Sequence, residues 1–104
     1  MKMPPNTSSI GIEAIDDVIH GRLRLGIMAY LSAVNPVSFP ELLEKTGTSN
    51  GNLSTHLTKL EAAGYVSQEK GYAGKKPQTL VHLTDSGRTA WIAYLEAMRF
   101  LLDG

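Results

Sequence analysis

Two predicted helices joined by a very short turn in the middle of the chain limit the possible folds more than any other feature. The first is predicted to begin at Ser38, because Ser38 and Glu41 match a capping box, in which each side chain satisfies a free backbone amide of the helix start. It is predicted to end at Gly47. The second is predicted to begin after Ser49, a good N-cap, and to stop at Gly64, a residue suited to the left-handed position after a helix.

The second of these helices carries a polar face that is poor in charge. Leu53, Leu57 and Leu60 follow an i, i+4, i+7 spacing, so they share one stripe that is predicted to be buried. An ordinary solvated face would carry several Glu and Lys, because serine and threonine are disfavoured inside helices. We interpret the face as donors and acceptors for DNA base edges, the alternative being an ordinary solvated surface. Its candidate contact residues are Asn50, Ser54, Thr55, Thr58 and Lys59.

A hairpin with a lysine-rich tip is predicted next. We expect strands at Tyr65–Glu69 and Val81–Leu83, joined by a glycine-rich loop over Lys70–Pro77 that is too long for a two-residue hairpin. The residues suited to contact phosphate or the minor groove are Lys70, Tyr72, Lys75 and Lys76. The alternative is a strand edge that lysine protects from aggregation. The two helices and this hairpin together predict a helix-turn-helix with a β wing, a shape that fits the major groove of DNA.

Outside this motif, the sequence predicts a tail and three more helices. Residues 1–9 are expected to form a flexible tail, followed by a helix over Ile10–His20. A further helix is predicted from Leu23 to about Val34, where Asn35-Pro36 stops it because the residue before proline avoids the α region. The last helix is predicted over residues 85–102.

The first and last of these helices carry more apolar surface than a small domain can cover internally. A pair of chains would bury that surface and would also double a binding site that one recognition helix and one wing cover only in part. The alternative is that the last helix only closes the core of a single chain. We expect an isologous homodimer, with an interface formed by Ile12, Ile15, Ile19, Trp91, Leu95, Met98 and Leu102.

Length and composition narrow the class of protein. The chain has 104 residues, of which residues 10–104 are expected to form one domain, mainly α with a small β hairpin. Ten basic and ten acidic residues cancel, which disfavours a protein that coats nucleic acid without sequence preference. With no cysteine, no signal-peptide pattern and no apolar run near the ~20 residues of a membrane span, a cytoplasmic protein is expected.

The sequence predicts neither catalysis nor a cofactor. It lacks a glycine-rich phosphate loop, an HExxH motif and a Gly-x-Ser-x-Gly motif. The three histidines lie on separate predicted elements without the spacing of metal ligands, so no metal site is expected. Of these, His56 is expected to be half-buried and His82 to point to solvent, while Asp16 and Asp17 are expected on a solvated face.

Several segments between residues 16 and 102 carry a resemblance to a known group of proteins. They are Asp17-Val18-Ile19-His20, Arg22-Leu23, Phe39, Glu41-Leu42, Leu53-Ser54-Thr55-His56-Leu57, Leu60-Glu61-Ala62-Ala63-Gly64-Tyr65-Val66, Gly74-Lys75-Lys76-Pro77 and Leu83-Thr84-Asp85-Ser86-Gly87-Arg88. Together they resemble small single-domain winged-helix transcriptional regulators related to the MarR and ArsR families. The resemblance implies a dimeric, prokaryotic-type repressor or activator that binds double-stranded DNA.

The same resemblance bears on the site and on an effector. Asn50, Ser54 and Thr55 match by position the family residues that touch DNA, and the lysines flank the wing tip. The chain lacks the cysteine and histidine clusters of metal-sensing ArsR relatives, and the longer helices that form the ligand cleft of many MarR proteins. A small-molecule effector is therefore either absent or bound between the terminal helices.

Two functional hypotheses follow. In the first, the chain is a sequence-specific transcriptional regulator that binds DNA as a homodimer, with half-sites about one helical turn, ~34 Å, apart. In the second, it is a winged helix that serves as a protein–protein interaction module without DNA binding, since a fold does not fix a function. The zero net charge favours the second, whereas the uncharged polar helix face and the lysine-rich wing favour the first.

Overall fold

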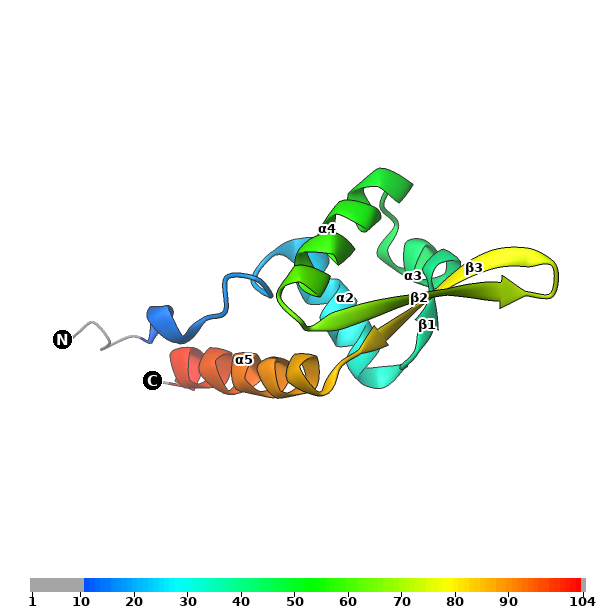
Figure 1. Cartoon of the computed structure of the whole chain (residues 1–104). Helices are drawn as coiled ribbons and strands as arrows, with labels where there is room; N and C mark the ends of the chain where they lie inside the picture. The colour runs from blue at the N-terminus through cyan, green and yellow to red at the C-terminus, as the bar shows by residue number, and fades with distance from the viewer. Residues whose placement is uncertain (1–10, 104) are drawn as a thin grey trace.

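Four α-helices, one 3₁₀ turn and a three-stranded sheet make up residues 11–103, the part of the chain that the computed structural model describes. The predicted flexible tail over residues 1–9 lies outside the described residues. Figure 1 shows α5 and the β2–β3 hairpin extending in opposite directions from a helical body. In chain order the elements are η1 (Ile12–Ala14), α2 (Arg22–Ala33), β1 (Val37–Ser38), α3 (Phe39–Thr46), α4 (Asn50–Ala62), β2 (Val66–Ala73), β3 (Lys76–Leu83) and α5 (Asp85–Asp103).

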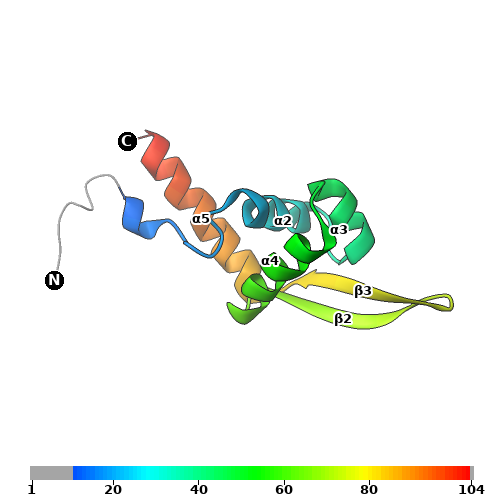
Figure 2. The ribbon, with the colours of Figure 1, turned by 90° about the horizontal axis from the view of Figure 1, so that it is seen from above.

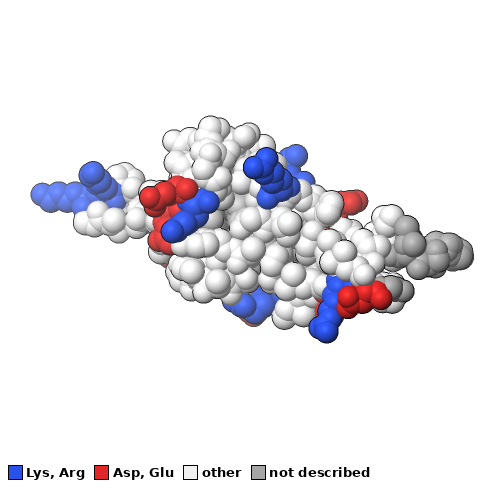
Figure 3. Space-filling model, turned by 180° about the vertical axis from the view of Figure 1, so that it is seen from behind, with Lys and Arg blue, Asp and Glu red and all other residues white. Residues whose placement is uncertain are grey.

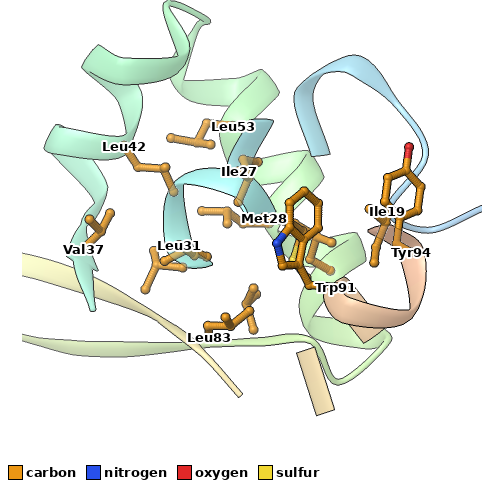
Figure 4. Close-up of a cluster of buried hydrophobic side chains, with 14 residues drawn as sticks. Ile19, Ile27, Met28, Leu31, Val37, Leu42, Leu53, Leu83, Trp91 and Tyr94 are labelled. Carbon is orange, nitrogen blue, oxygen red and sulfur yellow. The ribbon is translucent and has the colours of Figure 1, made fainter. Parts of the chain in front are cut away.

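One hydrophobic core joins the helices to the sheet. The predicted stripe of Leu53, Leu57 and Leu60 on α4 is fully buried, which confirms the helical spacing. It packs with buried side chains from α2, α3, the sheet and the start of α5, which converge in Figure 4. The remaining buried members of this core are Ile19, Ile27, Met28, Leu31, Val37, Leu42, Val66, Val81, Leu83, Trp91 and Tyr94.

The caps predicted for α3 and α4 are present. The hydroxyl of Ser38 accepts a hydrogen bond from the backbone amide of Glu41, at 3.2 Å, and Ser49 does the same for the amide of Asn52. The capping box is nevertheless only half formed, because the Glu41 carboxylate accepts from the hydroxyl of Tyr30 on α2 instead of reaching back to Ser38. This contact with Tyr30 ties α3 to α2.

The end of α4 follows the predicted glycine stop. Gly64 has φ 83°, the left-handed conformation that glycine adopts without strain. The amide of Tyr65 donates to the carbonyl of Leu60 at 3.0 Å, and that of Gly64 donates to Glu61, which is the hydrogen-bond pattern of a Schellman motif. The chain therefore turns directly from α4 into β2.

The wing is longer and more regular than predicted. β2 pairs antiparallel with β3 over their full lengths, up to the pair Ala73 and Lys76, so the predicted loop over Lys70–Pro77 is wrong. A two-residue turn, Gly74-Lys75, joins the strands, and Gly74 supplies the positive φ of 65° that such a turn needs. The sequence did not reveal these strands because both faces of the hairpin are exposed beyond its base, so no apolar alternation marks them.

A short third strand completes the sheet in the order β1-β3-β2 and was not predicted. Val37 of β1 pairs with Val81 of β3. Just before this pair, the side-chain oxygen of Asn35 accepts from the backbone amide of Leu83 at 2.9 Å, so a side chain takes the place of a strand partner. The sequence showed Asn35-Pro36 only as a helix stop, and α2 does end at Ala33 as expected.

The helix predicted over Ile10–His20 is wrong over its described residues. Only η1 is helical there, and Ile10 itself lies outside the described part. The side chain of Asp16 accepts from the backbone amides of Val18, at 2.8 Å, and Ile19, at 3.3 Å, and such local bonds compete with helix formation. The last helix, by contrast, matches its prediction within one residue, and the Thr84 hydroxyl caps it by accepting from the amide of Gly87.

Candidate nucleic-acid interface

The outer face of α4 is open to solvent, as its composition predicted. Its five candidate contact residues, Asn50, Ser54, Thr55, Thr58 and Lys59, are all exposed. In Figure 1 α4 lies along the upper surface of the molecule, and no other helix or strand covers its outer side. The hydroxyl of Thr58 donates to the carbonyl of Ser54 at 2.9 Å, which leaves its oxygen free to accept from outside. The face thus presents short side chains that donate and accept hydrogen bonds, and Lys59 is the one charged residue among these five.

The wing presents its cations along the outer half of the hairpin. Lys70, Lys75 and Lys76 are exposed, and the ring of Tyr72 between them is 76% exposed. Figure 2 shows the hairpin leaving the body beside α4, and Figure 3 shows positively charged side chains gathered at its projecting end. Nearer the base, the partly exposed imidazole of His82 bonds to the exposed Glu69 carboxylate at 3.0 Å.

Side chains beneath α4 fix its position, and the sequence did not reveal them as a group. Arg24 donates from Nε to the carbonyl of Val18 and from Nη1 to Nδ1 of His56, the second at 2.9 Å. His56 is half-buried as predicted, and its pKa is lowered by burial, and further by the positive charges of Arg24 and Lys59. α4 is therefore linked through Arg24 to the segment that precedes α2.

A second link joins the same segment to the start of the wing. The hydroxyl of Tyr65 donates to the Asp16 carboxylate, and this hydrogen bond, with burial and the negative charge of Asp16, raises the pKa of Tyr65 to about 12. Asp16 is thus half-buried and bonded, which corrects the prediction that it lies on a solvated face. No periodic pattern could have indicated the contact, because 49 residues separate the two partners.

Comparison with known proteins identifies the same winged-helix fold that the structure shows. Residues 23–102 match the family described as the winged helix DNA-binding domain. The chain belongs to this family. An uncharacterized protein from Methanocaldococcus jannaschii is 32% identical over 78 residues, which make up 75% of this chain and 85% of that protein.

Solved structures share the winged-helix fold. A transcriptional regulator homologue from Pyrococcus horikoshii has a TM-score of 0.82 at 29% identity, covering 88% of this chain and 92% of that one. A MarR-family transcriptional regulator from Silicibacter pomeroyi has a TM-score of 0.66 at 22% identity, covering 92% of this chain and 64% of that one. The predicted winged helix-turn-helix, mainly α with a β hairpin, is confirmed, and so is the resemblance in fold to MarR-family regulators.

The residues expected at a dimer interface of this winged-helix protein fall into three groups according to their burial. Ile19 and Trp91 belong to the core of the single chain, where Trp91 stacks on Tyr94 with ring centroids 5.8 Å apart. Ile15 and Met98 are half-buried against that core. The exposed group consists of Ile12, Leu95 and Leu102, beside which Ile92 and Phe100 are also exposed.

Within residues 11–103, no three His, Asp or Glu side chains are grouped so that they could hold a metal ion. No helix of that same range is both long enough and apolar enough to cross a membrane.

Proposed function

We propose that this winged-helix protein is a sequence-specific transcriptional regulator that binds DNA as a homodimer in the cytoplasm. In this proposal α4 enters the major groove, and the wing lysines contact the backbone or the minor groove. The observation that carries it is the exposed, uncharged outer face of α4 beside a hairpin whose free end carries exposed lysines. Membership of a family of DNA-binding domains supports the same reading.

The side chains on α4 suggest how bases are read. Asn50 offers both a donor and an acceptor, whereas Ser54, Thr55 and Thr58 offer hydroxyls. No arginine lies among the candidate contacts to make the bidentate guanine contact that gives strong discrimination. We therefore expect moderate base readout, with water bridges and DNA shape supplying a larger share of the specificity.

The terminal elements suggest how two chains pair. Exposed apolar side chains gather on α5 and η1, at the end of the molecule opposite the wing, where Ile12, Leu95 and Leu102 face solvent. A second copy related by two-fold symmetry would cover this surface and place two α4 helices for half-sites about one helical turn, ~34 Å, apart.

Selection of bound duplexes from a random DNA pool, followed by a salt titration, tests the DNA-binding part. The logarithm of affinity should fall with the logarithm of salt by about 0.9 per neutralised phosphate. Replacing both Lys75 and Lys76 by alanine should reduce that slope by about 2, whereas Arg88→Ala on α5 should leave it unchanged. The absence of duplex binding even at low salt would favour the interaction-module hypothesis instead.

Sedimentation of charged variants tests the dimer. Leu95→Asp places a carboxylate in the proposed interface and should shift the protein toward monomer. Ala93→Asp is the matched control, because Ala93 is also exposed on α5 but lies about 200° around the helix from Leu95. A Leu95→Asp protein that sediments as an intact dimer would place the interface elsewhere.

A further inference from the structure

His56 lies at the edge of the exposed face of α4, between that face and the core. It follows the exposed Thr55 by one residue, which is about 100° around a helix, and it precedes the buried Leu57. Lys59 is also exposed and lies between Thr55 and His56 around the helix, about one turn farther along. If the outer face of α4 enters the major groove, this edge of the helix lies toward the sugar-phosphate backbone.

The contact with Arg24 determines which nitrogen of the His56 ring carries the proton. A guanidinium has only donors, so Nδ1 of His56, which lies 2.9 Å from Nη1 of Arg24, must be the acceptor. A neutral imidazole has one acceptor and one donor nitrogen, and therefore Nε2 carries the hydrogen. Burial and the positive charges of Arg24 and Lys59 lower the pKa of His56 from 6.5, which keeps the ring neutral at pH 7.

The other ring nitrogen of His56, Nε2, is open to solvent. Over residues 11–103, Arg24 is the one hydrogen-bond partner of this half-buried ring, and it is bonded at Nδ1. Within the same range, every buried nitrogen or oxygen on a side chain that is not exposed has a hydrogen-bond partner. Because Nε2 has no partner there, it is not buried. The ring thus presents a fixed N–H donor to the outside.

The surroundings of this donor favour an anion. Among the described residues, the charges that act on His56 are those of Arg24 on α2 and Lys59 on α4, and both are positive. The guanidinium of Arg24 is held in place, because its Nε also donates to the carbonyl of Val18. A Cβ atom added at Gly21 would lie 3.4 Å from its Nη2, so the group also packs against the backbone.

We propose that Nε2–H of His56 donates to a phosphate of the DNA backbone, and that Arg24 is a positioning residue that holds the ring in the required tautomer. This contact rests on the proposed function, and it adds His56 to the residues interpreted as DNA contacts from the sequence. Lys59 contacts the same stretch of backbone as a point charge. A contact to phosphate fixes the register of α4 on the duplex without reading its sequence.

¹⁵N NMR of the imidazole rings in the full chain tests the tautomer and the contact. At pH 7 we expect Nδ1 of His56 to be unprotonated and Nε2 to be protonated, both in the free protein and in its complex with a selected duplex. The duplex should shift the Nε2–H signal and slow its exchange with water. A ring protonated at both nitrogens in the complex, or an Nε2–H signal that the duplex leaves unchanged, would overturn the proposal.

His56→Asn separates the roles of the two ring nitrogens. Its amide oxygen can replace Nδ1 as the acceptor for Arg24, but the shorter side chain has no donor at the position of Nε2. Binding to every duplex should weaken roughly 10-fold. The salt dependence should not change, because no charge is lost. His20→Asn is the matched control and should bind normally, since the ring of His20 also bonds through Nδ1, to Tyr94 on α5 at 2.9 Å.

Two results of this measurement would refute the contact. One is a folded His56→Asn protein that binds duplexes as tightly as the wild type. The other is a salt slope lowered by about 1, because it would show that the wild-type contact is made by a charged imidazolium. The NMR measurement uses the wild-type protein, so it decides the question even if His56→Asn does not fold.

A double-mutant cycle with Arg24→Met tests the positioning role. If Arg24 acts through His56, Arg24→Met should weaken duplex binding less in the His56→Asn background than in the wild type. Arg24→Lys, which keeps a donor and the charge, should bind more tightly than Arg24→Met. Equal losses in the two backgrounds would reject the positioning role. The absence of any duplex binding at low salt would reject the proposed function itself, whereas duplex binding with an unperturbed His56 ring would reject this contact alone.

Discussion

The close packing of Gly87 against the start of β2 predicts a large effect from adding a single methyl group. A Cβ atom at Gly87 would lie 2.0 Å from the carbonyl oxygen of Tyr65 and 2.8 Å from Cδ1 of Leu83, whereas real Cβ contacts are essentially never below 3.0 Å. That carbonyl also accepts the amide of Thr84 at 3.1 Å. Gly87→Ala must therefore move backbone by about 1 Å and weaken this hydrogen bond.

The expected cost combines the two effects. Overpacking of this kind costs about 1–3 kcal/mol, and a weakened hydrogen bond costs about 0.5–1.5 kcal/mol. We expect Gly87→Ala to lower the free energy of unfolding by about 3 kcal/mol, and the Tm by about 15 °C for a domain of this size. The consequence is measurable by urea and thermal denaturation followed by circular dichroism.

Gly26→Ala is the matched control, because it is also a glycine inside a helix but faces open space. There the gain in helix propensity should stabilise the protein by about 0.8 kcal/mol. The same substitution thus has opposite signs at two positions. A Gly87→Ala protein as stable as the wild type would show that α5 does not pack on Tyr65 as described.

Four further predictions concern side chains on and around α4. Because the pKa of Tyr65 is raised from 10 to about 12, its contribution to stability should be complete below pH 10 and lost as pH rises through about 12, and Tyr65→Phe should abolish this part of the pH dependence. Because the pKa of His56 is lowered from 6.5, its contribution should be complete above that pH and lost as pH falls below it. Arg24→Gln should raise the His56 pKa only in part, as NMR titration of the imidazole would show, since burial is the larger cause. Ser49→Ala should cost about 1 kcal/mol in urea denaturation, because it removes the cap of α4.

Local signals in the sequence were sufficient to predict the helix-turn-helix. Ser38, Ser49 and Gly64 act through residues within five positions along the chain, so their roles are visible in the sequence itself. The exposed face of α4 could be predicted for the same reason, because Leu53 and Leu57 fix which side of the helix is buried.

Features that depend on distant residues could not be predicted. Asp16 contacts Tyr65, and Arg24 contacts His56, and both contacts join segments that are far apart in the chain. Asp16 also lies in a segment that is not helical. A cavity lies beside Gly26 only because α2, α3 and the turn before α4 meet around it. Periodicity also could not show that Trp91 would be used within the chain's own core.

Thr84 connects the wing directly to α5, so a change in the tilt of α5 would be passed to the wing. Thr84 is the one residue between β3 and α5, and its hydroxyl and amide are bonded to the carbonyls of Gly64 and Tyr65. A hairpin of eight-residue strands is about 26 Å long. Tilting α5 by about 10° would therefore swing the wing tip by about 4–5 Å, close to the ~6 Å width of a minor groove. Small tilts of α5 are thus magnified at the far end of the hairpin.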